Sequence, residues 1–415
     1  MPAFLLLMLA GFGEPAHPVE YRFNVDVFEG LFYEENLFSE STRTFDQDDR
    51  YNIIGVYPGL RLDFENNAHA SVLGEMEWIH SWEAASDERL TEDETRVGIA
   101  HAFVGWTSPL WSVEAGRMPF RMGDGRILSN DEPGASFAYG GRAKTYWQGD
   151  FLLAFDACPM AALTWGFRPA FYETFELTAI WFKDRENRMA GLFRPWFVDA
   201  GVKSSGDLYW IGGDADFFAG DVYLSVMAFY QFGAVRVDFP NAGTRMDVAA
   251  YMADLEASYN ITDRMSAGGF LFLASGDRRP LRGNVEAFLS PMPFHDRSPI
   301  FFSGGFERYD RSESFRLGGV TWAGVATPGL TLSFYDPSGF NAVFSGAVMF
   351  PDGELMDFDD WIGWETDIDL SFEYGPHCRF FAEGGVFFHG DHVRNISGTR
   401  PDPAYRLAGG VVLSY

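Results

Sequence analysis

Hydrophobic and polar residues alternate along much of this chain, and the segment 364–374 shows the pattern without a break. Aromatic, aliphatic and Thr residues occupy every even position, whereas four carboxylates and Ser371 occupy the odd positions. A period of two places the two sets on opposite faces of a β-strand. The charged face cannot lie in a dry core, because isolated buried charges cost too much free energy. One wet face and one apolar face flanked by aromatic residues are typical of the wall of a transmembrane β-barrel.

The same alternation recurs along the whole chain. Apolar residues of one parity face polar or charged residues of the other in the segments near 21–27, 54–64, 72–78, 151–156, 175–181, 209–217 and 251–259. A soluble β-sandwich also alternates. It would not, however, keep so many acids on one parity while placing Trp and Tyr at the ends of the other. The pattern therefore predicts an all-β fold, a transmembrane antiparallel β-barrel.

The connections between these segments are of two kinds. Turn-forming residues predict short turns at 66–67, 108–109, 148–150, 219–221, 262–263, 328–329 and 375–376. Long polar segments lie at about 34–50, 83–95, 121–136, 158–173, 233–245, 277–314, 337–363 and 390–403. Short periplasmic turns and long extracellular loops are the layout of bacterial outer-membrane barrels. The segment 158–206 fits least well, because Arg194-Pro195-Trp196 interrupts a strand and Ser204-Ser205 would have to form a tight turn.

Counting the segments predicts about 18 strands, with 16 as the alternative. An even number keeps both termini on the periplasmic side. Residues 19–415 then form a single barrel domain, which at this size can leave an aqueous channel. No apolar run reaches the roughly 18 residues that a membrane-spanning helix needs. Residues 1–18 contain an apolar stretch of signal-peptide length without a basic start or a clean cleavage site, and we expect a signal peptide or leader.

Composition narrows the class of protein further. Hydrophobic residues make up 47% of the 415 residues and aromatic residues 17%, as expected where lipid-facing and lumen-facing positions alternate. The 59 acidic residues exceed the 31 Lys and Arg, giving a formal charge of -28. Such a charge argues against binding nucleic acid, which requires a basic surface. Cys158 and Cys378 are too few for a disulfide framework and fall on strands predicted to lie far apart, so we expect free thiols.

The last eleven residues form one more alternating segment. Tyr405, Leu407, Val411, Leu413 and Tyr415 share one face, and the final residue is aromatic. This ending resembles the C-terminal strand of Gram-negative outer-membrane proteins, which the barrel-assembly machinery reads through those alternate positions. The resemblance implies an outer-membrane location, with that machinery and membrane lipid as partners. The alternative is a hydrophobic strand that merely ends at the terminus.

A second resemblance concerns the segment 116–126, Gly-Arg-Met-Pro-Phe-Arg-Met-Gly-Asp-Gly-Arg. It is similar to the Gly-Arg-Gln-x-Phe-x-x-Gly-Asp-x-Arg pattern of alginate-export-type porins, with Met118 in place of the Gln. The resemblance implies an 18-stranded monomeric barrel with a charged pore. The alginate channel of that family is strongly basic, to suit a polyanion. This chain is strongly acidic, so an anionic polysaccharide is not the expected cargo.

Nothing in the sequence predicts catalysis or a cofactor. Neither a Gly-x-Ser-x-Gly elbow nor a phosphate-binding Gly-rich loop is present, and the eight His residues are scattered. His389-Gly390-Asp391-His392 and the acidic clusters 46–49 and 357–360 could bind a divalent ion. None has the ligand spacing of a dedicated site, and solvated loops are the simpler interpretation. We therefore expect no metal site.

The inward parity of the predicted strands concentrates acidic residues toward the lumen. The candidate pore-lining acids are Glu75, Glu77, Asp214, Asp216, Asp254, Glu256, Glu365, Asp367, Asp369, Glu373 and Glu383. The candidate basic residues lie on or between two neighbouring strands, around the segment 121–136: Arg117, Arg121, Arg126, Arg142 and Lys144. If that segment folds inward, a transverse field orients polar solutes and selects them by charge. Alternatively, these residues pair with one another and line a wet wall.

Three functions are compatible with this sequence. The leading hypothesis is an outer-membrane porin for passive diffusion of small polar solutes or ions, which favours cations or neutral solutes. The second is a structural barrel that sheathes a partner, such as a multihaem cytochrome electron conduit. The chain has no Cys-x-x-Cys-His motif, so any haem would belong to that partner. The third is an outer-membrane enzyme whose Ser and His residues are scattered through the wall.

Overall fold

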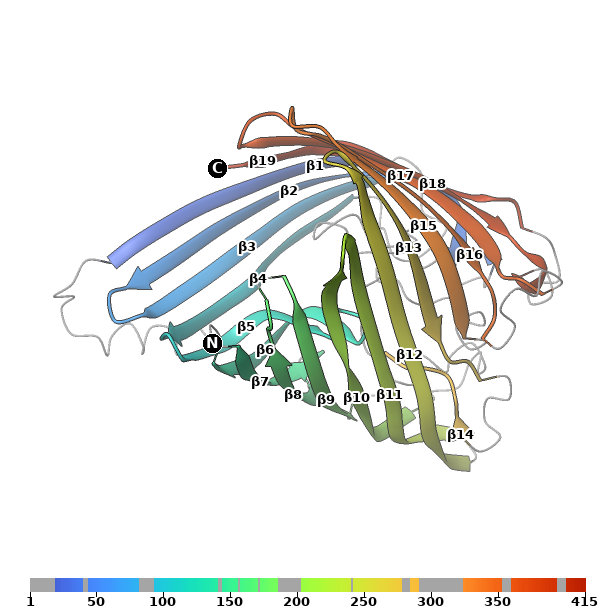
Figure 1. Ribbon diagram of the computed structural model, residues 1–415, viewed down its shortest axis with the longest axis horizontal. Coiled ribbons are helices and arrows are strands. Elements are labelled where there is room, and N and C mark those ends of the chain that lie inside the picture. Colours follow the sequence, from blue (N-terminus) through green and yellow to red (C-terminus); the bar gives the residue numbers. More distant parts are fainter. Residues whose placement is uncertain are drawn as a thin grey trace.

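The computed structural model describes most of the chain. The described residues are 19–39, 44–81, 93–140, 144–155, 157–170, 172–185, 203–239, 242–277, 284–290, 324–352, 360–393 and 401–415. They form one curved sheet of long strands that closes into a barrel (Figure 1). No helix among them is long and apolar enough to cross a bilayer.

Nineteen strands are present in the described part of the chain. Their bounds are β1 Val19–Ser39, β2 Thr44–Phe64, β3 Ala68–Ser81, β4 Asp93–Thr107, β5 Trp111–Met122, β6 Leu128–Tyr139, β7 Thr145–Ala154, β8 Cys158–Phe167, β9 Thr174–Asp184, β10 Lys203–Ala219, β11 Val222–Phe239, β12 Ala242–Thr262, β13 Met265–Ala274, β14 Asn284–Val285, β15 Val325–Tyr335, β16 Phe340–Met349, β17 Gly363–Glu373, β18 Cys378–His389 and β19 Ala404–Ser414.

Eighteen of these strands make the closed ring. Each pairs antiparallel with its neighbours in the chain, β13 pairs directly with β15, and β19 returns to pair with β1. The two-residue strand β14 lies outside the ring and pairs in parallel with β12. The ring confirms the predicted antiparallel barrel and the count of 18 strands. Every strand of the ring has a paired neighbour on each side, so the backbone groups of the wall can pair among themselves.

Contacts between distant strands identify the inner face. Asp254 on β12 pairs with Arg126, which follows β5 on the other side of the ring. Starting from Asp254, the register through β13, β15 and β16 places Glu365, Asp367 and Asp369 of β17 on the same inner face. Trp364, the residue beside Glu365, lies on the outer face and is 36% exposed, whereas Glu365 is fully buried. The predicted alternation of β17 is confirmed.

Large apolar side chains cover the outer face, with aromatic residues toward both ends of the strands. Tyr209 stacks on Phe232 toward the ends of β10 and β11 that lie away from the short turns, and Phe175 stacks on Phe217 toward the short-turn ends of β9 and β10. All four side chains lie on the outer parity. An apolar band between two aromatic girdles is typical of a surface that faces lipid.

The last strand of the barrel pairs with the first. The N–H of Tyr415 donates to the carbonyl of Val25 and the N–H of Val25 donates to the carbonyl of Tyr415, at distances of 3.0 and 2.9 Å. Tyr405, Leu407 and Tyr415 are exposed on the outer face, as the terminal alternation predicts. The first residue of β1 and the last residue of β19 both lie at the short-turn end of the barrel. Both termini of the barrel are therefore on one side, as predicted from the even strand number.

Two of the predicted turns are wrong. Residues 148–150 lie inside β7 and residues 328–329 lie inside β15. The turn after β15 is formed by residues 336–339 instead, where Gly339 has a φ of +98° and the Asp336 carboxylate accepts a hydrogen bond from the N–H of Ser338. That backbone hydrogen bond holds the pKa of Asp336 below its ordinary value. Gly149 and Gly329 do not break their strands. At Gly329 the Phe270 ring packs where a side chain would lie, whereas a Cβ at Gly149 would meet nothing within 4 Å.

Several predicted long loops are largely strand. The segments 34–50, 121–136, 158–173, 233–245 and 337–363 contain parts of β1 and β2, β5 and β6, β8, β11 and β12, and β16. Ser204-Ser205 lies in β10 rather than in a turn. In β11 and β12 the polar residues mislead because these strands extend beyond the apolar band. The segments 1–18 and 194–196 lie outside the described residues. Cys158 and Cys378 are free thiols, as predicted.

The seam between β1 and β19 offers a test of closure. A Cβ at Gly410 would lie 2.1 Å from the Glu29 carbonyl on β1, whereas at Gly409 the nearest atom would be 3.5 Å away. We expect Gly410→Ala to destabilise the barrel by about 1–3 kcal/mol through overpacking, and Gly409→Ala to be close to neutral. Urea unfolding in lipid vesicles measures both variants. Equal stability of the two would contradict the closed seam.

Candidate functional site

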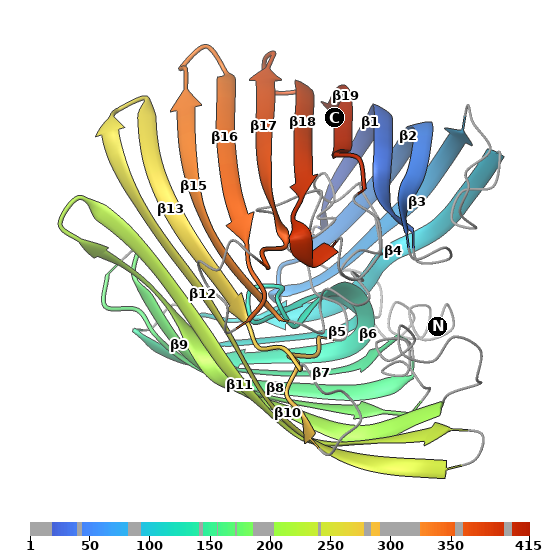
Figure 2. The same ribbon diagram turned by 90° about the vertical axis from the view of Figure 1, so that its right-hand side faces the viewer.

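A hairpin leaves the barrel wall and enters the lumen. β5 pairs with β4 only from Ser112 to Arg117, and β6 pairs with β7 only from Gly134 to Tyr139. Beyond these points, residues 118–122 and 128–133 pair only with each other within the described ladders. Figure 2 shows β5 and β6 curving into the barrel. The inward fold that the sequence analysis considered for the segment 121–136 is therefore present.

The tip of this hairpin is a tight turn set by its sequence. Gly123, Asp124 and Gly125 have φ values of +56°, +45° and +85°. Only Gly, and to a lesser extent Asp or Asn, adopts this region readily. The N–H groups of Gly125 and Ile127 both donate to the carbonyl of Met122, at 3.1 and 3.2 Å. The Gly-Asp-Gly triplet therefore reverses the chain within five residues.

One face of the hairpin packs against the inner wall. Met118, Phe120 and Met122 are each 4% exposed, and Leu128 is fully buried. They belong to one apolar cluster with residues of β7 to β11, namely Leu152, Met160, Phe182, Trp210, Met227 and Phe229. The opposite face, with Pro119 and the half-exposed Arg121, points away from this wall. The hairpin and this cluster fill part of the barrel interior, which we call the packed half.

An ion pair fixes the tip of the hairpin to the far wall. Arg126 Nε lies 2.9 Å from Asp254 Oδ2, and the two side chains are 5% and 4% exposed. The Ser290 hydroxyl donates to the Arg126 carbonyl at 2.8 Å. Asp254 belongs to β12, so the contact spans 128 positions of sequence. Removing either partner of such a buried ion pair strongly destabilises the fold, because the remaining charge would be uncompensated.

A second segment inside the barrel meets the tip. The side chain of Gln231 on β11 donates to the carbonyl of Leu289 at 2.9 Å and accepts from its N–H at 2.8 Å. Val285, Ala287 and Leu289 join the same apolar cluster. Residues 284–290 therefore line the packed half beside the hairpin.

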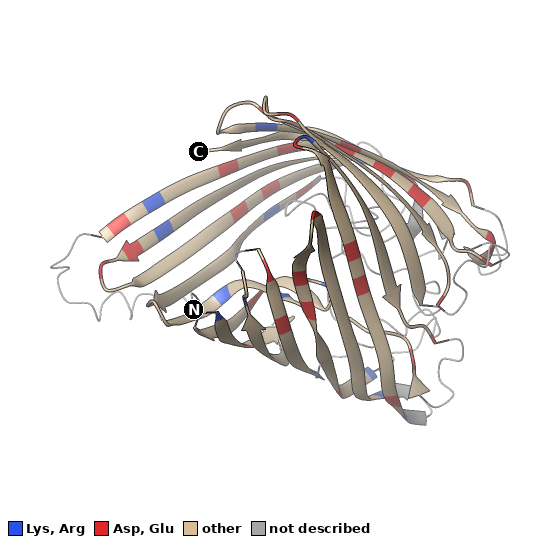
Figure 3. Cartoon of the chain, in the orientation of Figure 1, with Lys and Arg blue, Asp and Glu red and all other residues tan. Residues whose placement is uncertain are grey.

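Acidic residues gather on the inner face of β17 and β18. Asp369 is the register partner of Glu383, and Glu365 and Asp367 continue the row along β17. The Ser345 hydroxyl donates to Asp367 at 3.3 Å. Gly385 is the register partner of Asp367 on one side and of Arg406 on the other. Arg406, on β19, is 2% exposed. Figure 3 shows acidic residues along these strands and along others of the wall.

A second acidic group lies on β9 and β10. Asp214 is the register partner of Glu176. Asp216 accepts hydrogen bonds from the hydroxyls of Tyr223 and Thr174, at 2.8 and 3.1 Å. The Tyr146 hydroxyl donates to Glu176. Each carboxylate in this group except Asp214 has a hydroxyl donor from a neighbouring strand in these contacts, which offsets the loss of hydration on the inner face.

Further candidate acids occupy the inner face separately. Glu77 on β3 is 3% exposed and accepts a hydrogen bond of 2.8 Å from the Tyr57 hydroxyl. Glu75 shares its parity, Glu256 lies two residues from Asp254, and Glu373 ends β17 on the inner parity. The structure therefore places every candidate acid on the inner face but in separate groups. Several are more buried than a fully wet wall predicts, because the hairpin and aromatic residues enclose them.

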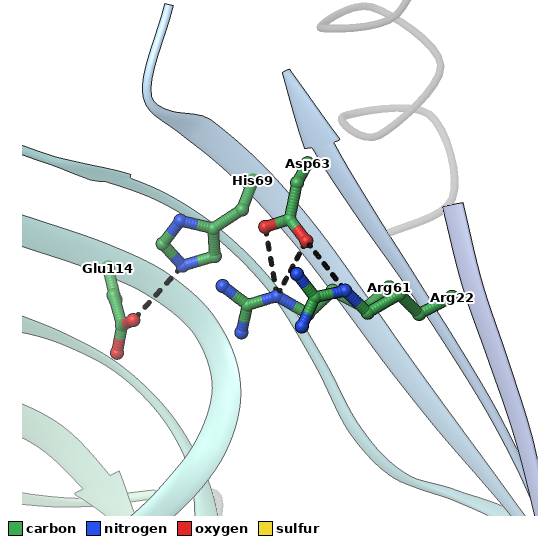
Figure 4. A network of polar contacts seen from close by, with 5 residues as sticks. All are labelled: Arg22, Arg61, Asp63, His69 and Glu114. Atoms are coloured by element: carbon green, nitrogen blue, oxygen red, sulfur yellow. Dashed lines mark hydrogen bonds and ion pairs between the residues drawn. The ribbon is translucent and has the colours of Figure 1, made fainter. Parts of the chain in front are cut away.

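Charged residues also meet inside the barrel near its short-turn end (Figure 4). Arg61 Nε lies 3.0 Å from Asp63, and Arg22 Nε lies 3.8 Å from the same carboxylate. His69 Nε2 lies 3.1 Å from Glu114, although the two residues are on β3 and β5. The strand between them carries Gly105, where a Cβ would lie 2.5 Å from the His69 ring. The missing side chain lets the pair reach across β4.

The basic candidates are distributed differently from the prediction. Arg117 and Arg121 lie on the hairpin, where Arg117 Nε donates to the carbonyl of Ala100 and Arg121 pairs with Asp124. Arg126 lies at the hairpin tip. Lys144 lies in the connection after β6, at the opposite end of the barrel. The expectation that it joins the cations around the segment 121–136 is wrong, because that hairpin is shorter than predicted. Arg142 lies outside the described residues.

Sequence reasoning missed several residues of the interior. Glu132 on β6 is 1% exposed and accepts from Asn130 and from the N–H of Phe155. Its parity matches Leu128, so the alternation of β6 could have found it. Arg406 alternates with Tyr405 and Leu407 and could have been found in the same way. The Met and Phe residues of the packed half carried no such signal, because an inner face predicted to be polar gives no reason to place apolar side chains there.

No group of three or more His, Cys, Asp or Glu side chains is arranged to bind a metal ion among the described residues. Of the suggested loop clusters, His392 Nδ1 lies 3.2 Å from Asp360. His389 is buried at the C-terminal end of β18. Residues 357–359 lie outside the described part of the chain.

Comparison with known proteins relates this barrel to solved structures alone. No family model and no curated protein matches the sequence. The fold is similar to OccAB3 of Acinetobacter baumannii, with a TM-score of 0.58 and 8% identity over 95% of this chain and 99% of that chain. It is also similar to Pseudomonas aeruginosa OpdK, crystallised with vanillate, with a TM-score of 0.54 and 10% identity over 95% and 99% of the two chains. These identities relate the folds only.

The ion pair at the hairpin tip can be tested by paired substitutions. We expect Arg126→Leu to destabilise the barrel by about 3–5 kcal/mol, because Asp254 is left buried without its counter-ion. Arg121→Leu on the same hairpin should cost about 0–1 kcal/mol, since its partner Asp124 is half exposed. The double variant Arg126→Leu/Asp254→Leu should recover part of the loss. Urea unfolding of wild type, Arg126→Leu, Asp254→Leu and the double variant gives the coupling energy, and equal losses for Arg126→Leu and Arg121→Leu would exclude it.

Proposed function

We propose that this chain is an outer-membrane porin through which small polar solutes or ions diffuse. The observation that best supports this proposal is the closed 18-stranded ring, whose interior is narrowed on one side by its own hairpin. Barrels of 16 to 18 strands can enclose an aqueous channel. The solved structures that share the fold are bacterial outer-membrane porins, which supports the same role here.

The outer-membrane location rests on the wall and its connections. The outer face carries an apolar band between aromatic girdles, and several connections at one end of the barrel are short turns. Both features are typical of bacterial outer-membrane barrels. The short-turn end, with both termini of the barrel, is the periplasmic side.

A channel accounts for the interior better than a sheath does. A sheath needs a lumen free to enclose a partner protein. In this barrel the hairpin, residues 284–290 and the apolar side chains of β7 to β11 pack together in part of that space. The fold-sharing structures are porins rather than enzymes, which also favours transport over catalysis.

We further propose that the passage favours cations or neutral solutes. Glu365, Asp367, Asp369 and Glu383 form one acidic group on the inner face of β17 and β18, which begins beside Ala347 and Phe387 of the apolar cluster. Fixed carboxylates attract cations and repel anions at close range. The exposed Arg121 on the free face of the hairpin is compensated by its ion pair with Asp124, so the hairpin does not offset this acidic group.

The relation to alginate-export-type porins remains a hypothesis. The segment that resembles their pattern, 116–126, forms the inward strand and tip of the hairpin. Its Gly, Asp and Arg residues have structural roles here, in the turn and in the ion pair with Asp254. We propose that the likeness reflects this shared hairpin rather than a shared anionic cargo.

Charge selectivity tests the proposal. We expect purified protein in a planar bilayer to give open, cation-favouring conductance steps. The triple variant Glu365→Gln/Asp367→Asn/Asp369→Asn should shift the reversal potential in a salt gradient toward zero, because it removes the acidic row from the inner face of β17. A control variant removes three acids at the short turns, Glu65→Gln/Asp221→Asn/Asp263→Asn, whose field is screened within about 8–10 Å at physiological salt. An absence of conductance would contradict the porin, and a shift equal in both variants would contradict the placement of selectivity on β17.

A further inference from the structure

Two side chains at the base of the hairpin bond to main-chain groups of the neighbouring strands. On one side, Arg117 Nε donates to the carbonyl of Ala100 on β4 at 3.3 Å. On the other side, Glu132 Oε1 accepts from the N–H of Phe155, in the turn between β7 and β8, at 3.0 Å. We call these two hydrogen bonds the base contacts. Each strand of the hairpin contributes one of them, β5 through Arg117 and β6 through Glu132.

The first base contact lies where β5 stops pairing with the wall. That pairing ends at Arg117 and Ala102. Two residue pairs further on, the same register would place Pro119 opposite Ala100, but a proline has no N–H to donate. Ala100 is also the residue that the bulge between β3 and β4 skips, and the extra residue of a bulge is left out of the ladder. The Arg117 guanidinium therefore supplies a donor at a point where the proline cannot.

The second base contact is the counterpart on the β7 side. The pairing of β6 with β7 ends at Gly134 and Leu152, and three residue pairs further on the same register would place Asp131 opposite Phe155. Because the hairpin has left the wall at this point, the N–H of Phe155 donates to the Glu132 carboxylate instead. Phe155 has a φ of +56°, which is unfavourable for a bulky residue and persists only where contacts fix it. The hydrogen bond to Glu132 is one such contact.

The chemical types of the two side chains follow from the groups that they contact. A guanidinium carries only donors, and an ionised carboxylate carries only acceptors. The carbonyl of Ala100 requires a donor and the N–H of Phe155 requires an acceptor, so the two side chains could not exchange places. Glu132 is 1% exposed, so water competes little for its hydrogen bonds with Asn130 and Phe155. Hydrogen bonds that involve a charged group are also stronger than neutral ones.

We propose that Arg117 and Glu132 are positioning residues of the channel. They fasten the two strands of the hairpin to β4 and to the turn between β7 and β8, and they thereby fix the angle at which the hairpin enters the lumen. The tip is held separately, by Arg126 and Asp254. A hairpin that is held at both ends leaves a passage of constant width. That consequence rests on the proposed function, whereas the base contacts can be tested without transport.

Hydrogen exchange of the full barrel in lipid tests the base contacts. Arg117→Met and Glu132→Met keep a long side chain but remove the donor and the acceptor, respectively. We expect the amides of the segments 116–134 and 153–155 to exchange about tenfold faster in each variant, since a hydrogen bond to a charged group is lost and the hairpin base opens more often. Arg117→Lys and Glu132→Gln keep a donor and an acceptor, so they should exchange at nearly the wild-type rate.

The matched control is Arg121→Met, which removes a guanidinium from the same hairpin. Arg121 bonds to Asp124 within the tip, so its loss should leave exchange at the base unchanged. Equal acceleration in Arg121→Met, or no acceleration in Arg117→Met, would overturn the proposal. Equal acceleration in Glu132→Gln and Glu132→Met would assign the effect to charge and would also overturn it. Arg117 shares the hairpin face of Arg121, away from the apolar cluster, so its variants decide the matter even if Glu132→Met does not assemble.

Exchange elsewhere in the barrel separates positioning from overall stability. The strands β15 to β18 make no ladder with the hairpin or with β7 in the described part of the chain, so their exchange should not change in the Met variants. Acceleration of the same size in β15 to β18 would mean general destabilisation and would overturn the positioning role.

Conductance of the same proteins distinguishes the two proposals. We expect one narrow distribution of single-channel steps for wild type, Arg117→Lys and Glu132→Gln, and a broader one for the two Met variants. Faster exchange in the Met variants without conductance in any protein would refute the porin and retain the base contacts. Conductance with unchanged exchange would do the reverse. Faster exchange with an equally narrow distribution would overturn the role of the base contacts in the passage.

Discussion

Closure of the backbone ladder is the constraint on which the rest of this structure depends. A sheet in a bilayer must satisfy its N–H and C=O groups internally, because hydrocarbon offers no partner for them. The reciprocal hydrogen bonds of Val25 and Tyr415 complete that ladder between the first and last strands. Once the ring is closed, each residue faces either outward or inward. The apolar band and the acidic groups are both consequences of this single division.

The hairpin departs from the ring and shows what the lumen requires. Residues 118–122 and 128–133 give up pairing with β4 and β7 within the described ladders. In exchange they bury Met118, Phe120 and Met122 against the inner wall and place Arg126 beside Asp254. The interior is therefore a partial apolar core joined to a polar passage. The same two-residue period gives the hairpin one apolar face and one face with exposed charged residues.

Much of this architecture could be predicted from the sequence because the outer face must be apolar in every strand. The alternation of 364–374 correctly placed Glu365 and Trp364 on opposite faces. Element boundaries were harder to predict, since β11 and β12 continue beyond the apolar band with residues such as Arg236 and Arg245. The acids were assigned to the right face, but their grouping depends on register and on long-range contacts. The bulge in the pairing of β3 with β4 skips Ala100, so β4 changes parity along its length and a simple count misplaces its residues.

The separation of Arg126 and Asp254 by 128 positions has a consequence for biogenesis. The hairpin is made long before β11 and β12, and a lone two-stranded ribbon is marginally stable in water. It can acquire its packing surface only when the second half of the barrel has assembled. The ribbon can therefore reach its final position only after the strands of its far wall have joined the barrel.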